Sequence, residues 1–127
     1  MKTAKHLGIW MDHSIAHIME ITDGKIVTSS VKSGFTKQEK EQGSASVENL
    51  GHTNKQLQLS DYYKQLRNII VNYEEVLLFG PTTAQNELLN LLKADPDFEK
   101  IKIEVKHADE MNVNERIAFV RGYFIHD

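Results

Sequence analysis

Residues 6–31 read HLGIWMDHSIAHIMEITDGKIVTSSV and contain three apolar stretches separated by turn residues. The first stretch, 6–11, is almost continuously apolar and stops at Asp12, as a strand does before a tight turn. Residues 16–21 and 26–31 flank TDGK at 22–25, whose Asp-Gly pair is a β-hairpin signal. The sequence therefore predicts three antiparallel strands at the start of the domain.

The next stretch, about 33–56, has no hydrophobic periodicity and is rich in Gly, Ser, Thr, Asn, Gln and balanced charge. Loops longer than about 12 to 15 residues are uncommon in compact domains and tend to be functional or disordered. We therefore expect a long polar loop here, and this loop is the first place to look for function.

Helix and strand patterns alternate after this loop. Ser60 is expected to cap a helix with an apolar stripe that includes Tyr62, Leu66 and Ile70. The continuous apolar run VLLF at 76–79, stopped by Gly-Pro, predicts a strand covered on both faces. A second helix is expected to open at Thr82, with Gln85 as its capping-box partner, and to run through the leucines at 88, 89, 91 and 92.

The last third of the chain predicts one more strand and one more helix. Apolar and charged residues alternate over 101–106, as in a strand with one solvated face or at a sheet edge. Asn112 with Glu115 predicts the cap of a helix whose buried stripe is Val113, Ile117, Val120 and Phe124.

The resulting order is β-β-β-α-β-α-β-α in a single α/β domain, 1–127. Right-handed crossovers, with the two most apolar runs in the middle, give a mixed five-stranded sheet of order 3-2-1-4-5 with helices on both faces. This is the topology of the ribonuclease H-like folds and of related domains in translation factors. A fold of this kind carries no chemistry by itself.

Composition narrows the function classes. The chain has 127 residues, no cysteine and a formal charge of -3, from 15 basic and 18 acidic residues. It therefore has no disulfide framework or thiolate zinc site, and the charge argues against avid, charge-driven binding of nucleic acid. No secretion signal or membrane span is recognisable, so we expect a cytoplasmic protein without membrane contact.

Polar residues follow the strands that should lie at the centre of the sheet. In an open α/β sheet the ligand crevice lies at the carboxyl ends of the strands, where the strand order switches direction. The candidates for a small polar cleft there, with the N-terminus of the second helix available to an anion, are Asp12, His13, Thr82, Thr83, His107 and Asp109. The alternative is that these residues cap the helix and end the strands.

Catalytic signatures are incomplete. A two-metal nuclease needs several convergent carboxylates, and only Asp12, Asp61 and Glu115 are candidates, with Gly80-Pro81 where another acid would be expected. Asp12-His13-Ser14 cannot form a triad, because neighbouring residues of an extended chain point to opposite faces. No metal-binding or nucleotide-binding motif is present, so we expect neither a metal nor a cofactor.

Several short motifs along the chain together resemble a known family. They are Trp10-Met11-Asp12-His13 with Ala16, Phe79-Gly80-Pro81 with Glu87-Leu88, Ala108-Asp109, and Ala118-Phe119-Val120-Arg121 with Tyr123-Phe124. In their order and placement they resemble the bacterial relatives of the middle domain of archaeo-eukaryotic peptide release factor and Pelota, small proteins often labelled translational machinery or host-attachment proteins.

This resemblance implies a role on the ribosome and also identifies a departure from the family. In release factors the loop between the third strand and the first helix carries Gly-Gly-Gln, which helps water cleave peptidyl-tRNA. The matching loop here has Gln42-Gly43, without the paired glycines that let backbone crowd against substrate. Pelota-like members also lack the tripeptide and bind ribosomes without hydrolysis.

The leading hypothesis is a non-enzymatic domain that binds the ribosome or structured RNA in translation stress, rescue or dormancy. Its candidate contact residues are Lys37, Lys40, Gln42, Gly43, His52, Lys55, Lys64 and Arg67. The alternatives are a protein-interaction domain, with a homo-oligomer as one form of it, and a metal-dependent nuclease. The interaction hypothesis rests on Phe119, Tyr123 and Ile125, which would form an exposed patch unless the last helix has a wide buried face.

Overall fold

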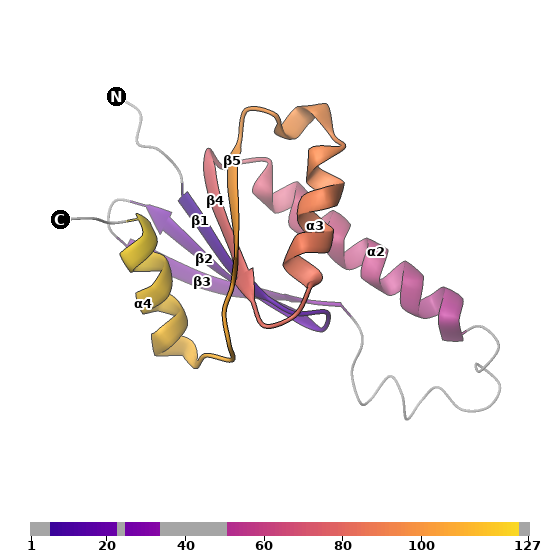
Figure 1. Cartoon of the computed structure of the whole chain (residues 1–127), viewed down its shortest axis with the longest axis horizontal. Coiled ribbons are helices and arrows are strands. Elements are labelled where there is room, and N and C mark those ends of the chain that lie inside the picture. The colour runs from indigo at the N-terminus through magenta and orange to yellow at the C-terminus, as the bar shows by residue number, and fades with distance from the viewer. Residues whose placement is uncertain (1–5, 23–24, 34–50, 125–127) are drawn as a thin grey trace.

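The computed structural model of the chain describes residues 6–22, 25–33 and 51–124. The strands are β1 (His6–Met11), β2 (Ile15–Thr22), β3 (Lys25–Lys32), β4 (Glu75–Gly80) and β5 (Lys102–His107). The helices are α2 (Gly51–Ile70), α3 (Ala84–Lys93) and α4 (Val113–Phe124), with a short 3-10 helix, η2 (Pro96–Phe98), before β5. Figure 1 shows α2 and α3 on one side of the sheet and α4 on the other. The predicted order of elements is confirmed.

The strands form a five-stranded sheet of order β3-β2-β1-β4-β5, as predicted. β1 pairs antiparallel with β2 and parallel with β4, which in turn pairs parallel with β5. β1 and β4 are therefore flanked by a strand on each side and covered by helices above and below. This position explains why their sequences are almost continuously apolar.

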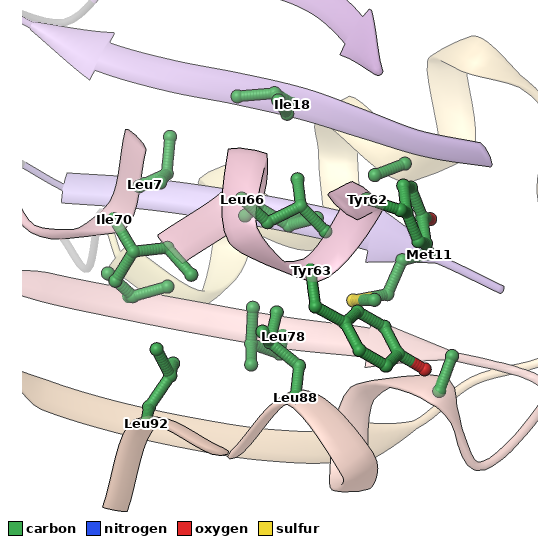
Figure 2. Packing of buried hydrophobic residues seen from close by; sticks show 14 of the residues in the cluster. Leu7, Met11, Ile18, Tyr62, Tyr63, Leu66, Ile70, Leu78, Leu88 and Leu92 are labelled. Carbon is green, nitrogen blue, oxygen red and sulfur yellow. The ribbon is translucent and has the colours of Figure 1, made fainter. Parts of the chain in front are cut away.

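Alternate residues of the central strands enter two separate hydrophobic clusters. Leu7, Ile9 and Met11 of β1 belong to the first core cluster, beneath α2 and α3. Trp10 belongs to the second core cluster, beneath α4, together with Leu77, Phe79 and Val120. Figure 2 shows the first core cluster, in which Ile70 of α2 lies near Leu7 and Tyr62 lies near Met11. α2 therefore runs antiparallel to β1.

The helix α2 is longer than the sequence pattern predicts. Its apolar stripe is confirmed, because Tyr62, Leu66 and Ile70 are fully buried. The helix begins at Gly51, however, so the prediction of one loop over 33–56 is wrong for 51–56, and Ser60 lies inside the helix instead of capping it. The first turns, GHTNKQLQ, carry no apolar stripe that could reveal a helix. A helix that is already nucleated by its packed half extends cheaply into such a segment.

The other two helices match their predicted cores in part. In α3, Leu88 and Leu92 are buried, but Leu91 is 51% exposed. In α4, Val120 is buried and Ile117 is half-buried, whereas Val113 is 55% exposed, so its predicted place in the buried stripe is wrong. Val113 is the first residue of α4 and borders the open cavity between this helix and the strands β2 and β3, so its side chain stays largely exposed.

Close approach of α4 to the sheet depends on Gly8 in the middle of β1. A Cβ atom at Gly8 would lie 2.5 Å from Cγ2 and 2.8 Å from Cγ1 of Val120. These separations are far shorter than the roughly 3.5 to 4.0 Å of an ordinary carbon contact. The missing side chain of Gly8 is therefore the space that Val120 fills.

Candidate functional site at the carboxyl edge of the sheet

The carboxyl ends of β1, β4 and β5 lie at one edge of the sheet, at the point where the strand order changes direction between β1 and β4. Three connections leave this edge. Asp12, His13 and Ser14 turn the chain from β1 into β2, residues 81–83 lead from β4 into α3, and residues 108–112 lead from β5 into α4. This is the edge at which the sequence predicts a polar crevice.

Asp12 builds the turn between β1 and β2. Its Oδ1 atom accepts hydrogen bonds from the backbone N–H groups of Ser14 at 2.7 Å and Ile15 at 2.9 Å. Its backbone carbonyl accepts a hydrogen bond of 2.8 Å from the Tyr62 hydroxyl of α2. An aspartate that satisfies the backbone of its own turn has a structural role, which accounts for its position without a catalytic one.

The neighbouring His13 takes part in a polar cluster centred on Glu87. Its Nε2 atom lies 3.1 Å from Oε1 and 3.2 Å from Oε2 of Glu87. The Tyr63 hydroxyl donates to Glu87 Oε1 at 2.6 Å, and the Thr83 hydroxyl donates to Oε2 at 3.1 Å. These four residues, the Glu87 cluster, connect the β1–β2 turn, α2 and the first turn of α3.

The hydrogen bonds of the Glu87 cluster shift the pKa values of Glu87 and Tyr63 in opposite directions. Partial burial raises the pKa of Glu87, but hydrogen bonds from Tyr63, His13 and Thr83 outweigh it and hold that pKa below its usual value. Burial, followed by the hydrogen bond to Glu87, raises the pKa of the Tyr63 phenol. A general base works best when its pKa lies near the working pH. The Glu87 carboxylate has a lowered pKa and both of its oxygens accept hydrogen bonds, so it is suited to connecting α2, α3 and the β1–β2 turn.

Gly80 and Gln85 fix the ends of the three parallel strands. A Cβ atom at Gly80 would lie 2.1 Å from the Met11 carbonyl oxygen, so only glycine allows β4 to pass β1 at this point. The Gly80 carbonyl accepts hydrogen bonds of 2.9 Å from Gln85 Nε2 and from the backbone N–H of Ala108. Gln85 Nε2 also lies 3.4 Å from the Lys106 carbonyl.

The predicted capping box at Thr82 and Gln85 is therefore wrong. α3 begins one residue later, with Thr83 as its N-cap residue, and the Thr83 side chain accepts no capping hydrogen bond from the helix backbone. The Thr82 hydroxyl accepts from the N–H of Ala84 at 3.2 Å. Gln85 is 1% exposed and faces the strand ends. A glutamine three residues after a threonine fits a capping box and also fits an inward-facing side chain, so the sequence alone could not distinguish the two.

The capping box of Asn112 and Glu115 is confirmed, with reciprocal hydrogen bonds of 2.9 and 2.8 Å.

The structure brings together only part of the predicted crevice. His13 and Thr83 meet in the Glu87 cluster, and Asp12 lies beside it in the turn. His107 and Asp109 instead face each other at 3.7 Å, with side chains that are 70% and 97% exposed. The sequence analysis missed Tyr63 and Glu87 as site residues. The signal for Glu87 was its position four residues after Thr83, which places the two side chains on one face of a helix.

The acids that a nuclease would require are not gathered at this edge. Asp61 is exposed on α2, while Glu115 belongs to the cap of α4 on the other side of the sheet. Within residues 6–22, 25–33 and 51–124 there is no group of three or more His, Asp or Glu side chains that could hold a metal ion. The two-metal arrangement considered from the sequence is therefore not assembled by Asp12, Asp61 and Glu115.

The candidate RNA-contact residues are distributed over α2 and a segment outside the described residues. His52 and Lys55 belong to the helix α2 and not to a loop. Lys64 is exposed on α2, whereas Arg67 contacts Asp95 at 3.6 Å. The remaining candidates lie outside the described residues; they are Lys37, Lys40, Gln42 and Gly43.

The residues proposed as an interaction patch on the last helix are partly buried. Phe119 stacks on Phe79 with ring centroids 4.6 Å apart. The Tyr123 hydroxyl donates to Glu104 at 3.0 Å, and its ring packs edge-on against Phe124. Both are partly buried and pack against the second core cluster, which supports the wide buried face over the exposed patch. Ile125 lies outside the described residues.

The sheet order and the helices on both faces define a ribonuclease H-like fold. Among solved structures, the Pelota protein of Thermoplasma acidophilum has a TM-score of 0.60 with 16% identity, over 94% of this chain and 32% of that chain. Pelota of Archaeoglobus fulgidus has a TM-score of 0.62 with 10% identity, over 98% of this chain and 33% of that chain. An archaeal translation termination factor has a TM-score of 0.58 with 12% identity, over 96% of this chain and 35% of that chain.

These comparisons establish a similarity of fold. The chain spans about a third of the length of the Pelota proteins and the termination factor that it matches. No protein-family model matches the sequence, and comparison with curated proteins finds no significant match. Among the helices in the described part of the chain, none has the length and apolar content needed to span a membrane.

Proposed function

We propose that this chain is a cytoplasmic, ribosome- or RNA-associated domain that acts in translation stress, rescue or dormancy without catalysing a reaction itself. The observation that carries the proposal is the similarity in fold between nearly the whole chain and part of Pelota and of a translation termination factor, each of archaeal origin. The short motifs that resemble the middle domain of those factors support the same reading, with this chain as a bacterial, single-domain relative.

The helix α2 supplies a surface for such contacts. Tyr62 anchors it at the carboxyl end of β1, so the helix residues before Tyr62 continue past this edge of the sheet. At about 1.5 Å per residue, the segment 51–61 extends about 16 Å further. Figure 1 shows this end of α2 reaching beyond α3. The projecting segment is polar in sequence and carries two of the candidate contact residues, His52 and Lys55.

The Glu87 cluster gives this projecting helix a rigid base. Tyr62 and Tyr63 are both buried and both donate hydrogen bonds, to the Asp12 carbonyl and to Glu87. The base of the projection is therefore fixed to β1 and α3 at the same time. A rigid scaffold that carries a polar segment is the common arrangement of binding domains, and it requires no catalytic group.

Co-sedimentation of the full chain with purified ribosomes tests the proposal, at about 50 mM and about 200 mM salt, where phosphate contacts differ strongly in strength. We expect binding at the lower salt that weakens at the higher salt. The double variant Lys55→Glu/Lys64→Glu should bind at least about tenfold more weakly, because it reverses two charges on α2. Arg121→Glu is the matched control, since Arg121 is exposed on α4 at the other face of the sheet.

Absence of the chain from the ribosomal pellet at both salt concentrations would reject the proposal. Equal loss of binding in the α2 variant and in the Arg121→Glu control would reject α2 as the contact surface. Far-UV circular dichroism of each variant establishes that its helices are retained before binding is compared.

A further inference from the structure

A second polar site lies on the opposite face of the sheet, between α4 and the strands β2 and β3. A cavity of about 250 Å³ opens there, lined by side chains that include His17, Met19, Thr28, Ser30, Arg116 and Ile117. With Ser29 and Val113, which also line it, the cavity is bordered by one guanidinium, one imidazole, three hydroxyl-bearing residues and three apolar side chains. Among the described residues that line it there is no carboxylate.

The guanidinium of Arg116 is held in place but is not neutralised. Its Nη1 atom donates to the Met111 carbonyl at 2.6 Å, and its Cζ atom lies 5.6 Å from the centre of the Trp10 ring. Within the described residues no Asp or Glu forms an ion pair with it. An arginine fork binds anionic oxygens through several parallel N–H groups, and the N–H groups of Arg116 beside the cavity can donate to an anion in this way.

His17 points to the same conclusion. It pairs with Ser30 across β2 and β3, and its ring lies 5.6 Å from that of Trp10. Among the residues that the structure describes, none forms a hydrogen bond with its side chain. Burial lowers the pKa of His17, the charge of Arg116 lowers it further, and the charge of Asp12 opposes this effect. An anion placed between His17 and Arg116 would pair with the guanidinium and favour the protonated form of the imidazole.

We propose that this cavity binds the phosphate group of a small phosphorylated organic molecule. An arginine fork, hydroxyl donors and an imidazole can satisfy the several oxygens of a phosphate monoester. Met19 and Ile117 offer an apolar wall for the organic part. Pockets for drug-sized ligands begin at roughly 300 Å³. The volume of this cavity is slightly smaller, so it suits a small metabolite. The site is independent of the ribosome contacts proposed for α2.

Isothermal titration calorimetry of the full chain with three probes tests the assignment. The probes are adenosine 5′-monophosphate, inorganic phosphate and adenosine, which together separate the phosphate from the organic body. We expect the monophosphate to bind most tightly, with adenosine at least about tenfold weaker, because each hydrogen bond to a charged group contributes about 10-fold or more to binding.

Two variants locate the site. Arg116→Gln should weaken binding of the monophosphate by about 10- to 100-fold through loss of the charged fork. Ser30→Asp should do the same by placing a carboxylate in the cavity, and its exposed position in β3 makes it the variant to rely on if Arg116→Gln fails to fold. Arg121→Gln and Asn114→Asp are the matched controls, because both residues are exposed on α4 and neither lines the cavity.

A spectroscopic measurement adds a readout that a purely structural role would not change. The His17 imidazole, followed by NMR during a pH titration, should show a higher pKa when the monophosphate is bound than when the protein is free. In the free protein the charged groups that act on this ring are Arg116, which lowers the pKa of His17, and Asp12, which raises it. An additional rise on titration with the monophosphate therefore reports the ligand.

Three results would overturn the assignment. They are no binding of the monophosphate at millimolar concentration, equal binding of the monophosphate and adenosine, and unchanged binding by Ser30→Asp. Equal affinity for inorganic phosphate and the monophosphate would reject the organic ligand in favour of the free anion.

Discussion

Replacing Gly8 by alanine adds one methyl group at the point where α4 crosses β1. That methyl would lie 2.5 Å from one methyl group of Val120 and 2.8 Å from the other. Val120 cannot move aside easily, because it is fully buried and its branched side chain has one strongly preferred rotamer in a helix. We therefore expect Gly8→Ala to force α4 away from the sheet.

The magnitude follows from two opposing effects. Overpacking of a filled core costs about 1 to 3 kcal/mol. Loss of the glycine's extra backbone freedom returns about 0.5 to 1 kcal/mol. The two ranges give a net destabilisation of about 0 to 2.5 kcal/mol, and their midpoints give about 1.3 kcal/mol. With an unfolding entropy of about 2.1 cal/mol/K per residue, the midpoint lowers the Tm of a 127-residue chain by about 5 °C.

A double-mutant cycle with Val120→Ala isolates the contact. The single change Val120→Ala removes two buried methyl groups and should cost about 2 to 3 kcal/mol. In the double variant the new methyl of residue 8 occupies the vacated space, so the clash disappears. We expect the double variant to be at least as stable as Val120→Ala alone, with a coupling energy of about 1 to 3 kcal/mol.

Urea unfolding measures all these free energies, with fluorescence of the single tryptophan, Trp10, and circular dichroism as two probes. Gly122→Ala is the matched control. A Cβ atom at Gly122 meets nothing within 4 Å, so this change in α4 should stabilise the fold by up to about 1 kcal/mol. Destabilisations of Gly8→Ala and Val120→Ala that add to within about 0.5 kcal/mol would refute the packing argument.

The remaining predictions concern the edge of the sheet and the cap of α4. The pKa of Glu87 is held below its ordinary value of 4.5, so its carboxylate stabilises the fold above that pH, and the contribution is lost as pH falls through the folded-state pKa. Between about pH 5 and about pH 3 the free energy of unfolding should fall less in Glu87→Gln than in the unmodified chain. The difference should be no more than about 1 kcal/mol, because the Glu87 side chain is partly exposed. A fall as steep as that of the control variant Glu110→Gln would contradict this. Gln85→Ala should cost about 1 to 3 kcal/mol in urea unfolding, because it leaves a backbone carbonyl at the end of β5 without its side-chain donor; a change under about 0.5 kcal/mol would show that the amide contributes nothing. Asn112→Ala should cost about 1 kcal/mol by removing the N-cap of α4, whereas the exposed Asn114→Ala should change stability by less than about 0.5 kcal/mol, and equal effects of the two would argue against the cap.

The candidate site shows where sequence reasoning succeeds and where it stops. Asn112 and Glu115 form the predicted cap because both partners lie within one helical turn. Thr82 and Gln85 have the same spacing, yet Gln85 turns inward to the carbonyls of Gly80 and Lys106. The Gly80 carbonyl lies at the end of β4, outside the helix, and Lys106 lies 21 residues away in β5, so helical spacing carries no information about either contact.

The sequence by itself determined the order of elements and the order of the sheet. Apolar periodicity and turn residues are local properties, and the two most apolar runs had to occupy the centre because only a central strand is buried on both faces. Tertiary structure alone decided the length of α2, since its first turns are polar and are helical only because the packed half already is. It also decided which polar side chains meet. The contact of His13 with Glu87 and the electrostatic interaction of His17 with Arg116 join residues 74 and 99 positions apart, and both depend on how helices lie across a sheet.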